Sequence, residues 1–418
     1  MQDNEKKPAL RFKGFTDPWE QRKLAELTKT ITTGKSVNSD EGEVSDGDIG
    51  VLKTSCVSYD RFNSSESKPV VKSEQQLVKC AVEKDSVIVS RMNTPERVGA
   101  CGYVSTDFPN LFLPDRLWKL KFQDTVDTYF VYMMLVSSAY KEKITSMASG
   151  TSGSMYNIPK ETFLNLQLVI PAKIDEQKQL GKILKKIDTL ITLHQRKYEK
   201  LVNIKKSMLD KMFPQNGASV PEIRFKGFTD PWEQRKLGEI AKEVVRNDPA
   251  SDAPIMMITA GNGFIEQSDR YAFNNAGESL KKYILLECGE LAYNHGASKL
   301  RPYGSCFALT TVEKARIPFV YHCFSVEKSN PEFLSIELNG ANVENQLRKI
   351  VSSGARMDGL LNIAYSEYTE VTVQLPKKEE QDWIAKFFKQ LDTLITLHQR
   401  KLEKLQNIKK SCLEKMFV

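Results

Sequence analysis

Few residues in this chain have the types and the spacing that catalysis requires. Residues 34–36, Gly-Lys-Ser, resemble the end of a phosphate-binding loop, but Lys29 stands where the first glycine of that loop is needed. Residues 261–263, Gly-Asn-Gly, could approach a phosphate, although this short pattern is more typical of a turn. The four histidines lie too far apart in the sequence for metal-ligand spacing: His194, His295, His322 and His398.

The chain also lacks the usual sequence motif of enzymes that methylate amino groups. Residues 330–333 read Asn-Pro-Glu-Phe, which departs at the third place from the Asn-Pro-Pro-aromatic motif of amino-methyltransferases. The chain shows no Ser/His/Asp order and no clear pair of carboxylates. We therefore predict that the chain is not an enzyme and that it binds no metal or cofactor of its own.

The elements that organise the chain are two copies of one helical segment. Residues 188–213 recur at 392–417 with four of 26 positions changed. Apolar residues spaced alternately by three and four predict a heptad seam and helices of about 39 residues, which we expect to pair antiparallel with each other. The seam residues are Leu180, Leu184, Ile187, Ile191, Tyr198 and Leu201 in the first helix, and Ile384, Phe388, Leu391, Ile395, Leu402 and Leu405 in the second.

A second repeat sets the order of the parts. Residues 11–24, RFKGFTDPWEQRKL, recur unchanged at 224–237, directly after the first helix and its linker. The chain therefore reads twice as repeat, variable region and helix. We expect Trp19 and Trp232 to anchor the repeats in the core. With antiparallel helices the chain would close into a ring, and Phe417 would lie near residue 11.

Composition is that of a water-soluble protein with two domains of ordinary size. The 418 residues contain no apolar run near 18 residues, and none of the seven cysteines forms a C-x-x-C pair, so we predict a cytoplasmic protein with reduced thiols. Net charge is +7, of which residues 173–213 carry +6 and residues 377–417 carry +4. These basic helices could face an acidic partner or a phosphate backbone, or form a solvated coiled-coil flank.

The two variable regions follow one plan without sharing a sequence. Each has short β-rich runs, a helical stretch (128–148 and 331–350) and a closing strand before a proline (162–171 and 367–376). We predict an α/β fold with four parts. Their bounds are 1–170 for the first globular region, 171–213 for the first helix, 214–375 for the linker and second globular region, and 376–418 for the second helix.

This layout resembles the specificity subunit of a type I restriction-modification system, over nearly the entire chain. The residues that carry the resemblance are the Glu-Gln pair that follows each closing proline, the D-T-L-I sequence further along each helix, and the W-E-Q-R-K-L end of each repeat. The resemblance implies two globular α/β target-recognition domains joined by two long antiparallel coiled-coil helices in a pseudo-two-fold circular arrangement.

The function that the resemblance implies is DNA recognition without catalysis. Each globular region would read one half of a split, asymmetric site in double-stranded DNA, and the helices would space the halves and dock two methyltransferase subunits. Those subunits would methylate adenine N6 with S-adenosylmethionine. Motor-nuclease subunits, which use ATP and Mg, would join that core.

Residues that contact DNA should then lie where the two regions differ. Arginine pairs with guanine and asparagine with adenine, whereas lysine and serine more often hold phosphates. In the first region the candidates are Lys53, Ser55, Arg91, Asn93, Thr94, Arg97, Ser152, Ser154 and Tyr156. In the second region they are Asn262, Asn294, His295, Ser298, Lys299, Arg301 and Arg356.

Two other functions remain open from the residues. The chain could be a stand-alone DNA-binding or architectural protein with two heads, or a scaffold whose heads grip proteins. The specificity-subunit function is favoured over both alternatives. Two near-identical helices fit two identical partners, and two divergent heads fit two different ligands.

Overall fold

The computed structural model describes residues 8–417 apart from 60, 151–154, 216, 271–276 and 352–359. The chain divides into two compact units, one of Met1–Arg196 with Gln399–Val418 and one of Lys197–His398, called unit 1 and unit 2 below. The four-part division of the sequence kept each long helix whole, whereas the boundary between the units cuts both. No helix in the described part of the chain is long and apolar enough to cross a membrane.

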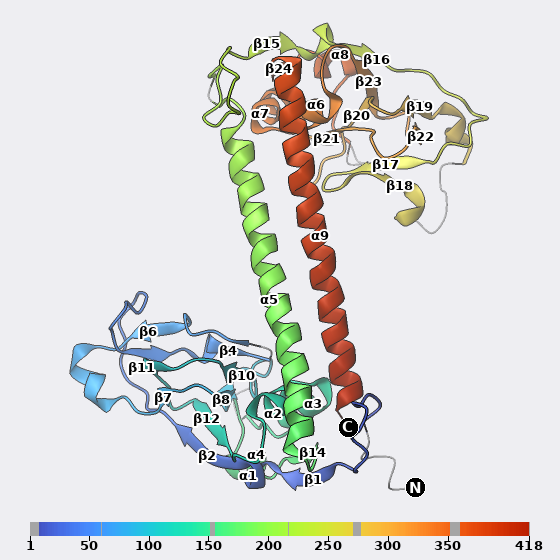
Figure 1. Ribbon diagram of the computed structural model, residues 1–418. Helices are drawn as coiled ribbons and strands as arrows, with labels where there is room; N and C mark the ends of the chain where they lie inside the picture. The colour runs from blue at the N-terminus through green and yellow to red at the C-terminus, as the bar shows by residue number, and fades with distance from the viewer. Residues whose placement is uncertain are drawn as a thin grey trace. The chain divides into compact units, whose positions relative to one another are not determined.

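Unit 1 is built on two four-stranded sheets, ordered β10-β8-β12-β2 and β6-β3-β11-β7, whose strands pair antiparallel except β11 with β3 (Figure 1). The strands of these sheets are β2 (Thr28–Thr33), β3 (Gly50–Leu52), β6 (Ser67–Pro69), β7 (Ala81–Val82), β8 (Ser86–Ser90), β10 (Cys101–Val104), β11 (Phe108–Phe112) and β12 (Leu117–Phe122). Strand β8 is buried along its whole length, so it forms the centre of the unit. Three two-stranded pairs complete it: β1 (Glu20–Lys23) with β14 (Gln167–Ile170), β4 (Val57–Ser58) with β5 (Arg61–Phe62), and β9 (Met92–Asn93) with β13 (Tyr156–Asn157).

The helical stretch expected at 128–148 is two helices, α2 (Thr128–Leu135) and α3 (Ser138–Ser146). The break falls at Ser137, whose backbone is extended and whose hydroxyl donates to the Met134 carbonyl, a bond that competes with helix continuation. Helix α2 is apolar on nearly every side and lies in the core. The closing strand expected at 162–171 is also shorter, because α4 (Lys160–Leu164) occupies its first part. The short helix α1 (Leu24–Leu27) begins at the last residue of the first repeat.

Unit 2 has one four-stranded sheet, β16-β23-β20-β21, and three two-stranded pairs, β15-β24, β17-β18 and β19-β22. Its strands are β15 (Glu233–Lys236), β16 (Ala241–Glu243), β17 (Met256–Thr259), β18 (Gly263–Glu266), β19 (Ile284–Glu287), β20 (Leu291–Asn294), β21 (Ser305–Ala308), β22 (Lys314–Ile317), β23 (His322–Val326) and β24 (Thr372–Leu375). Its helices before the second long helix are α6 (Pro331–Leu338), α7 (Ala341–Ile350) and α8 (Tyr365–Tyr368). Both expectations for this unit need the same corrections: the helical stretch breaks at Asn339-Gly340, and α8 replaces the first residues of the closing strand.

The two long helices are α5 (Ile174–Lys211, 38 residues) and α9 (Lys378–Met416, 39 residues), which confirms the expected length. None of the twelve seam residues is exposed. In unit 1, Lys409 of α9 pairs with Asp188 of α5 at 2.7 Å, and Phe417 packs on Phe130 beside the first half of α5. In unit 2, Lys205 pairs with Asp392 at 2.5 Å, and Phe213 packs near Phe388. Within each unit the helices are therefore antiparallel, as predicted.

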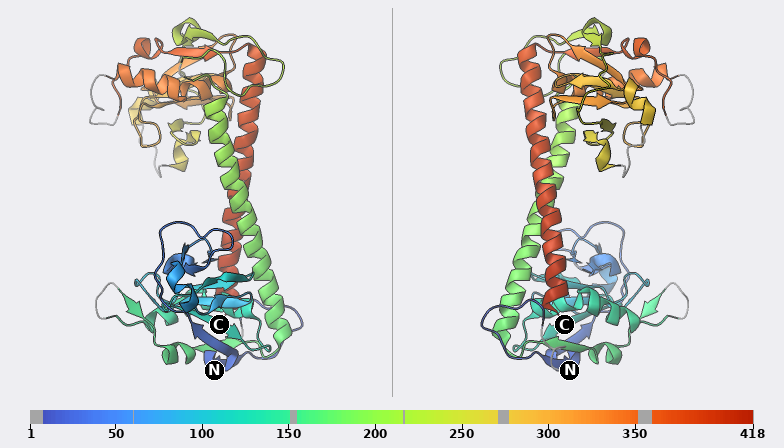
Figure 2. Two further views of the ribbon diagram at one scale, coloured as in Figure 1. Left: turned by 90° about the vertical axis from the view of Figure 1, so that its left-hand side faces the viewer. Right: turned by 90° about the vertical axis from the view of Figure 1, so that its right-hand side faces the viewer.

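The end of each long helix returns to a repeat. The Leu10 amide donates to the Lys415 carbonyl at 2.9 Å, and the Ile223 amide donates to the Lys211 carbonyl at the same distance. Met416 and Phe417 belong to the core of unit 1, and both views of Figure 2 show the last turns of α9 beside that unit. The expected proximity of Phe417 to residue 11 is confirmed, so residues 399–417 complete the unit that the amino-terminal repeat begins.

Candidate nucleic-acid interface

In unit 1 the loop that follows the central strand β8 brings several predicted residues together. The Arg91 amide donates to the Arg116 carbonyl at 3.1 Å, and the Ile158 amide donates to the Arg91 carbonyl at 2.9 Å. Strand β9 then pairs with β13, which sets Asn93 opposite Tyr156. The Gly99 amide closes the loop on Ser90. The loop of residues 91–99, called reading loop 1, is therefore held at both ends by the core.

The side chains of reading loop 1 differ in their freedom to reach a ligand. Asn93 is buried; its amide nitrogen donates to the Ser90 hydroxyl at 3.0 Å and its oxygen accepts from the Thr94 amide at 2.9 Å. Because Asn93 is buried and both polar atoms of its side chain hold neighbouring residues, we expect it to shape the loop rather than to contact a base. Arg91 is half-buried and donates from Nε to the Asp115 carbonyl, while Thr94 and Arg97 are exposed.

The other candidates in unit 1 lie outside this loop. Lys53 and Ser55 follow β3 on the second sheet, and the Ser55 hydroxyl donates to Glu66 at 2.6 Å. The Tyr59 hydroxyl, a few residues on, donates to the Val98 carbonyl at 2.6 Å and so ties this segment to reading loop 1. Ser152 and Ser154 lie outside the described residues.

Sequence reasoning missed two cations beside reading loop 1, Lys35 and Arg116, both exposed. The Ser36 hydroxyl donates to Asp115 at 2.5 Å, which places the end of β2 next to the segment that carries Arg116. Gly34 permits this approach, because a Cβ there would stand 1.5 Å from the Leu113 carbonyl oxygen. Residues 34–36 therefore form a close approach of the backbone to the segment of Leu113 and Asp115, and not a phosphate-binding loop.

Unit 2 places a loop of different sequence at the corresponding position. After β20, the Asn294 side chain accepts from the Gly296 amide at 2.9 Å and donates to the Ile258 carbonyl at 3.2 Å. The Leu361 amide donates to the His295 carbonyl, and Gly296 bridges to Leu360. The chain before the closing helix and strand thus pairs with this loop, residues 295–301, called reading loop 2, as it does in unit 1.

Reading loop 2 also divides into residues that hold it and residues that project. The Arg301 amide donates to the Ser298 hydroxyl at 3.0 Å, and the Arg301 guanidinium donates to the Asn339 carbonyl at the end of α6 at 2.6 Å. Burial lowers the pKa of Arg301 from its usual value. Lys299 and Leu300 are exposed at the tip, and the turn between β17 and β18 brings exposed Asn262 next to them, since Gly261 lies beside Leu300.

Two further candidates in unit 2 stand apart from the projecting tip. His295 is buried, with its ring 5.2 Å from the His322 ring and next to Tyr293, so it belongs to an aromatic cluster behind reading loop 2. Arg356 lies outside the described residues.

Each repeat is tied to a long helix by the same kind of ion pair. Arg11 forms two bonds with Glu176, at 2.6 and 2.8 Å, and Arg224 forms two with Glu380, both at 2.7 Å. These glutamates are 2% and 1% exposed, and each ion pair joins a repeat to the third residue of a long helix. Four residues separate Pro171 from Glu176 and three separate Pro376 from Glu380, and the extra residue in unit 1 lies before the helix begins.

The glutamine of each Glu-Gln pair holds the globular part. The Gln177 side chain donates to the Pro171 carbonyl and accepts from the amide of Asp127, the residue that caps α2. In unit 2 the Gln381 side chain makes the same two bonds, to Pro376 and from Asn330, the cap of α6. Trp19 and Trp232 are buried beside these contacts, as predicted. We call this repeated set of contacts the junction.

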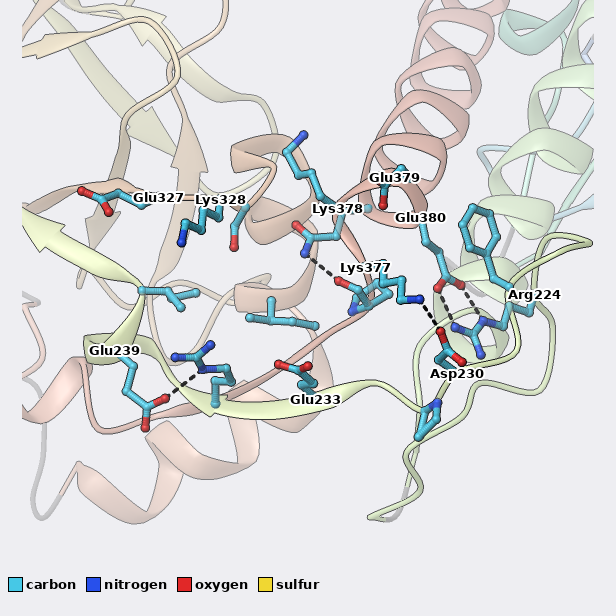
Figure 3. Close-up of a pocket in the computed structure, with 18 of the residues that line it drawn as sticks. Arg224, Asp230, Glu233, Glu239, Glu327, Lys328, Lys377, Lys378, Glu379 and Glu380 are labelled. Carbon is cyan, nitrogen blue, oxygen red and sulfur yellow. Dashed lines mark hydrogen bonds and ion pairs between the residues drawn. The ribbon is translucent and has the colours of Figure 1, made fainter.

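A cavity of about 740 Å³ lies at the junction of unit 2 (Figure 3). Its walls include Asp230, which pairs with Lys377 at 2.6 Å, and the Arg224–Glu380 pair. Six basic and six acidic residues line it, without histidine or cysteine. Its balanced charge does not favour a polyanion, and its residues offer no nucleophile with a base beside it.

Comparison with known proteins decides the family. The model of the family described as "Type I restriction modification DNA specificity domain" matches residues 16–203 and 229–407. The chain belongs to this family. Each matched stretch begins in a repeat and ends in a long helix, so the chain carries two specificity domains, one for each junction and reading loop. Specificity subunits of this family are non-catalytic.

Individual relatives agree with this assignment. The type I restriction enzyme MjaVIII specificity subunit of Methanocaldococcus jannaschii is 25% identical over 316 residues, 68% of each chain. A protein of the same organism, provisionally named the type I restriction enzyme MjaX specificity subunit, is 21% identical over 416 residues, 94% of this chain and 91% of the other. The crystal structure of a type I restriction-modification system S subunit from M. genitalium has the same fold, with a TM-score of 0.61 at 16% identity and coverage of 98% and 99%.

Proposed function

We propose that this chain is the DNA-specificity subunit of a type I restriction-modification complex that reads a split, asymmetric site. One observation carries the proposal: two loops of unrelated sequence follow corresponding central strands in two units whose junctions share the same ion pair and the same glutamine bonds. Two similar junctions with different reading loops suit the recognition of two different DNA sequences, and each unit would recognise one half of the site.

The residues that project from the reading loops are the best placed to contact DNA. In unit 1 these are Thr94 and Arg97, with Arg91, Lys35 and Arg116 beside them. Arginine can bind guanine with two bonds in the major groove, and the lysine suits a phosphate. In unit 2 Lys299 and Asn262 provide a cation and an amide, and Leu300, 64% exposed, provides an apolar contact for a thymine methyl group.

The long helices supply a docking face for partners. Outside the seam, both helices expose the leucine at one equivalent position of the repeat. Leu193 of α5 is 45% exposed and Leu397 of α9 is 43% exposed. Leu394 and Ile408 of α9 are 42% and 40% exposed. Exposed apolar stripes of this kind mark protein interfaces. We propose that the stripes dock two copies of one methyltransferase subunit, and that the helices set the gap between the half-sites.

Chemistry in this complex would reside in the partners. The methyltransferase subunits would bind S-adenosylmethionine and methylate adenine N6, and motor-nuclease subunits would bind ATP and Mg. This chain would act in the cytoplasm, where it would select the DNA.

Mapping of modified adenines tests the proposed function directly. The chain is co-expressed with the methyltransferase subunit in a host that lacks adenine methylation, and the modified adenines are located by long-read sequencing. We expect one split motif with a methylated adenine in each half. A stable complex that leaves the genome unmodified would contradict the proposal, and absence of a complex would favour the stand-alone DNA-binding function.

Mapping of modified adenines also tests which reading loop recognises which half-site. Replacing Arg97 by alanine should relax the half-site read by unit 1, with a loss of discrimination of roughly 10- to 100-fold at one base pair, because one good side-chain contact to a base contributes about 1–3 kcal/mol. Lys299→Ala is the matched control in unit 2, and it should leave the first half-site unchanged. If Arg97→Ala alters neither half-site, Arg97 contacts no base.

A further inference from the structure

The two junctions share the same ion pair and glutamine bonds, but the first turns of their long helices differ in aromatic content. On the first turns of α9, Trp383 is 59% exposed and lies 5.7 Å from the ring of Phe225, which lies 6.0 Å from Phe387. The matching positions of α5, counted from the shared Glu-Gln pair, are Gln179 and Ile183. Unit 1 keeps the repeat phenylalanine, Phe12, but carries Gln179 at the position of Trp383. Unit 2 therefore carries an aromatic patch, Trp383, Phe225 and Phe387, that unit 1 lacks.

The aromatic patch continues the apolar stripe of α9. At about 100° per residue, positions 383, 387, 394 and 397 fall on one face of the helix, next to the buried seam. Trp383 and Leu397 are 14 positions apart, which is roughly 21 Å along the axis. A partner helix that covers Leu394 and Leu397 would therefore reach the aromatic patch with a few more turns. On α5 the same path runs from Leu193 to Ile183 and ends at a polar Gln179.

A tryptophan at the position of Trp383 can contribute strongly to the binding free energy of a partner. It offers a wide rigid surface with few rotatable bonds, and aromatic anchors at the centre of an interface carry much of the binding free energy. A tryptophan that is more than half exposed in the unbound chain gains most of its burial only when a partner covers it.

We infer that the two methyltransferase docking sites are unequal, and that the site in unit 2, extended by Trp383, Phe225 and Phe387, fills first. This inference rests on the proposed function and names an order of assembly for it. The occupant is the same partner at both sites, because the aromatic patch is continuous with a stripe that both helices share. The complex would pass through an intermediate with one methyltransferase subunit, bound at unit 2.

Hydrogen exchange at limiting partner tests the order. The full chain is mixed with half an equivalent of purified methyltransferase subunit, and amide protection is measured by mass spectrometry in residues 378–391 and 174–187, whose sequences differ and can be told apart. We expect protection in 378–391 first. Loss of one aromatic anchor should weaken binding at unit 2 by roughly tenfold or more.

The chain supplies matched variants for this experiment. Trp383→Gln gives unit 2 the residue that unit 1 has, and should make the two helices gain protection together. Gln179→Trp builds the converse, and should raise protection of 174–187 at the same partner concentration. Both positions lie on helix surfaces, so the melting temperature of the free chain serves as a folding check.

Three outcomes would overturn the inference. Equal protection of both helices in the unaltered chain would show equal sites, and an unchanged order in Trp383→Gln would show that the aromatic patch does not set it. A dimer of the free chain that Trp383→Gln dissociates would assign the patch to a second copy instead. These results leave the proposed function intact, whereas failure of the methyltransferase subunit to bind at either helix would remove both.

Discussion

Replacing Glu176 by alanine is expected to destabilise unit 1 by roughly 3 to 5 kcal/mol, because the Arg11 guanidinium would be left buried without its partner. The Glu176 carboxylate accepts two bonds from Arg11 and one from the Trp19 indole at 3.3 Å. A guanidinium stays protonated at any pH at which proteins are folded, so in the variant the Arg11 cation cannot escape the cost by losing its proton. Chemical denaturation followed by circular dichroism measures the loss.

The duplicated junction provides the controls for this experiment. Glu380→Ala removes the matching partner of Arg224 and should cost a similar amount in unit 2. Exposed Glu20→Ala, in the same repeat, should change the free energy of unfolding by less than about 0.5 kcal/mol. A double variant, Arg11→Met with Glu176→Leu, should recover most of the loss, since no charge is then buried alone. A loss of less than about 1 kcal/mol in Glu176→Ala would show that water reaches Arg11.

Unit 2 is expected to lose stability as pH rises from about 4 to about 7, by roughly 3 kcal/mol. Glu337 of α6 is 4% exposed and accepts one bond, from the Gln374 amide at 3.0 Å. Burial raises the pKa of Glu337 from 4.5 to about 7. A raised pKa means that the folded chain holds the proton more tightly than the unfolded chain. This contribution is therefore complete below pH 4.5 and lost as pH passes through 7.

Glu337→Gln separates this group from every other titration. The amide keeps an oxygen that can accept from Gln374 and carries no charge, so the pH slope should flatten and the variant should be more stable than the unaltered chain at pH 8. Hydrogen exchange of the β24 amides reads unit 2 specifically. Glu313→Gln, at an exposed position, is the control for charge removal alone. Equal pH slopes in the unaltered chain and in Glu337→Gln would place the titration elsewhere.

The repeats were sufficient to predict the arrangement of the long helices, because they are long and because apolar residues spaced by three and four over such a length fit few structures other than a paired helix. The seam residues, the antiparallel pairing within each unit and the return of Phe417 to the first repeat all follow from two copies of one segment. The apolar pattern failed where a single polar side chain or a short helix interrupts it. Ser137 breaks one helical stretch through a bond to Met134, and α8 and α4 take residues whose apolar pattern also suits a strand.

The candidate site was predicted less completely, for a physical reason. Sequence identifies a side chain that can bind a base, but the hydrogen bonds that occupy it come from the fold. Asn93, Asn294 and Arg301 have the right chemistry, yet the side chain of each donates a hydrogen bond to a neighbouring part of the fold, at Ser90, Ile258 and Asn339. Arg116 was missed because it approaches reading loop 1 through strand pairing across the sheet. The Glu-Gln pair was noted as a motif, and the structure supplies its role at the junction.

The return of α9 to unit 1 has a consequence for synthesis on the ribosome. Unit 2 is one continuous stretch, Lys197–His398, so all of its residues are synthesised before residues 399–417. Unit 1 lacks Met416 and Phe417 in its core until that last stretch emerges. Domains generally fold as their residues become available. Unit 1, whose synthesis begins first, therefore cannot be completed before the last residues of α9 are released, and a free chain truncated after residue 398 should hold a folded second unit beside an incomplete first one.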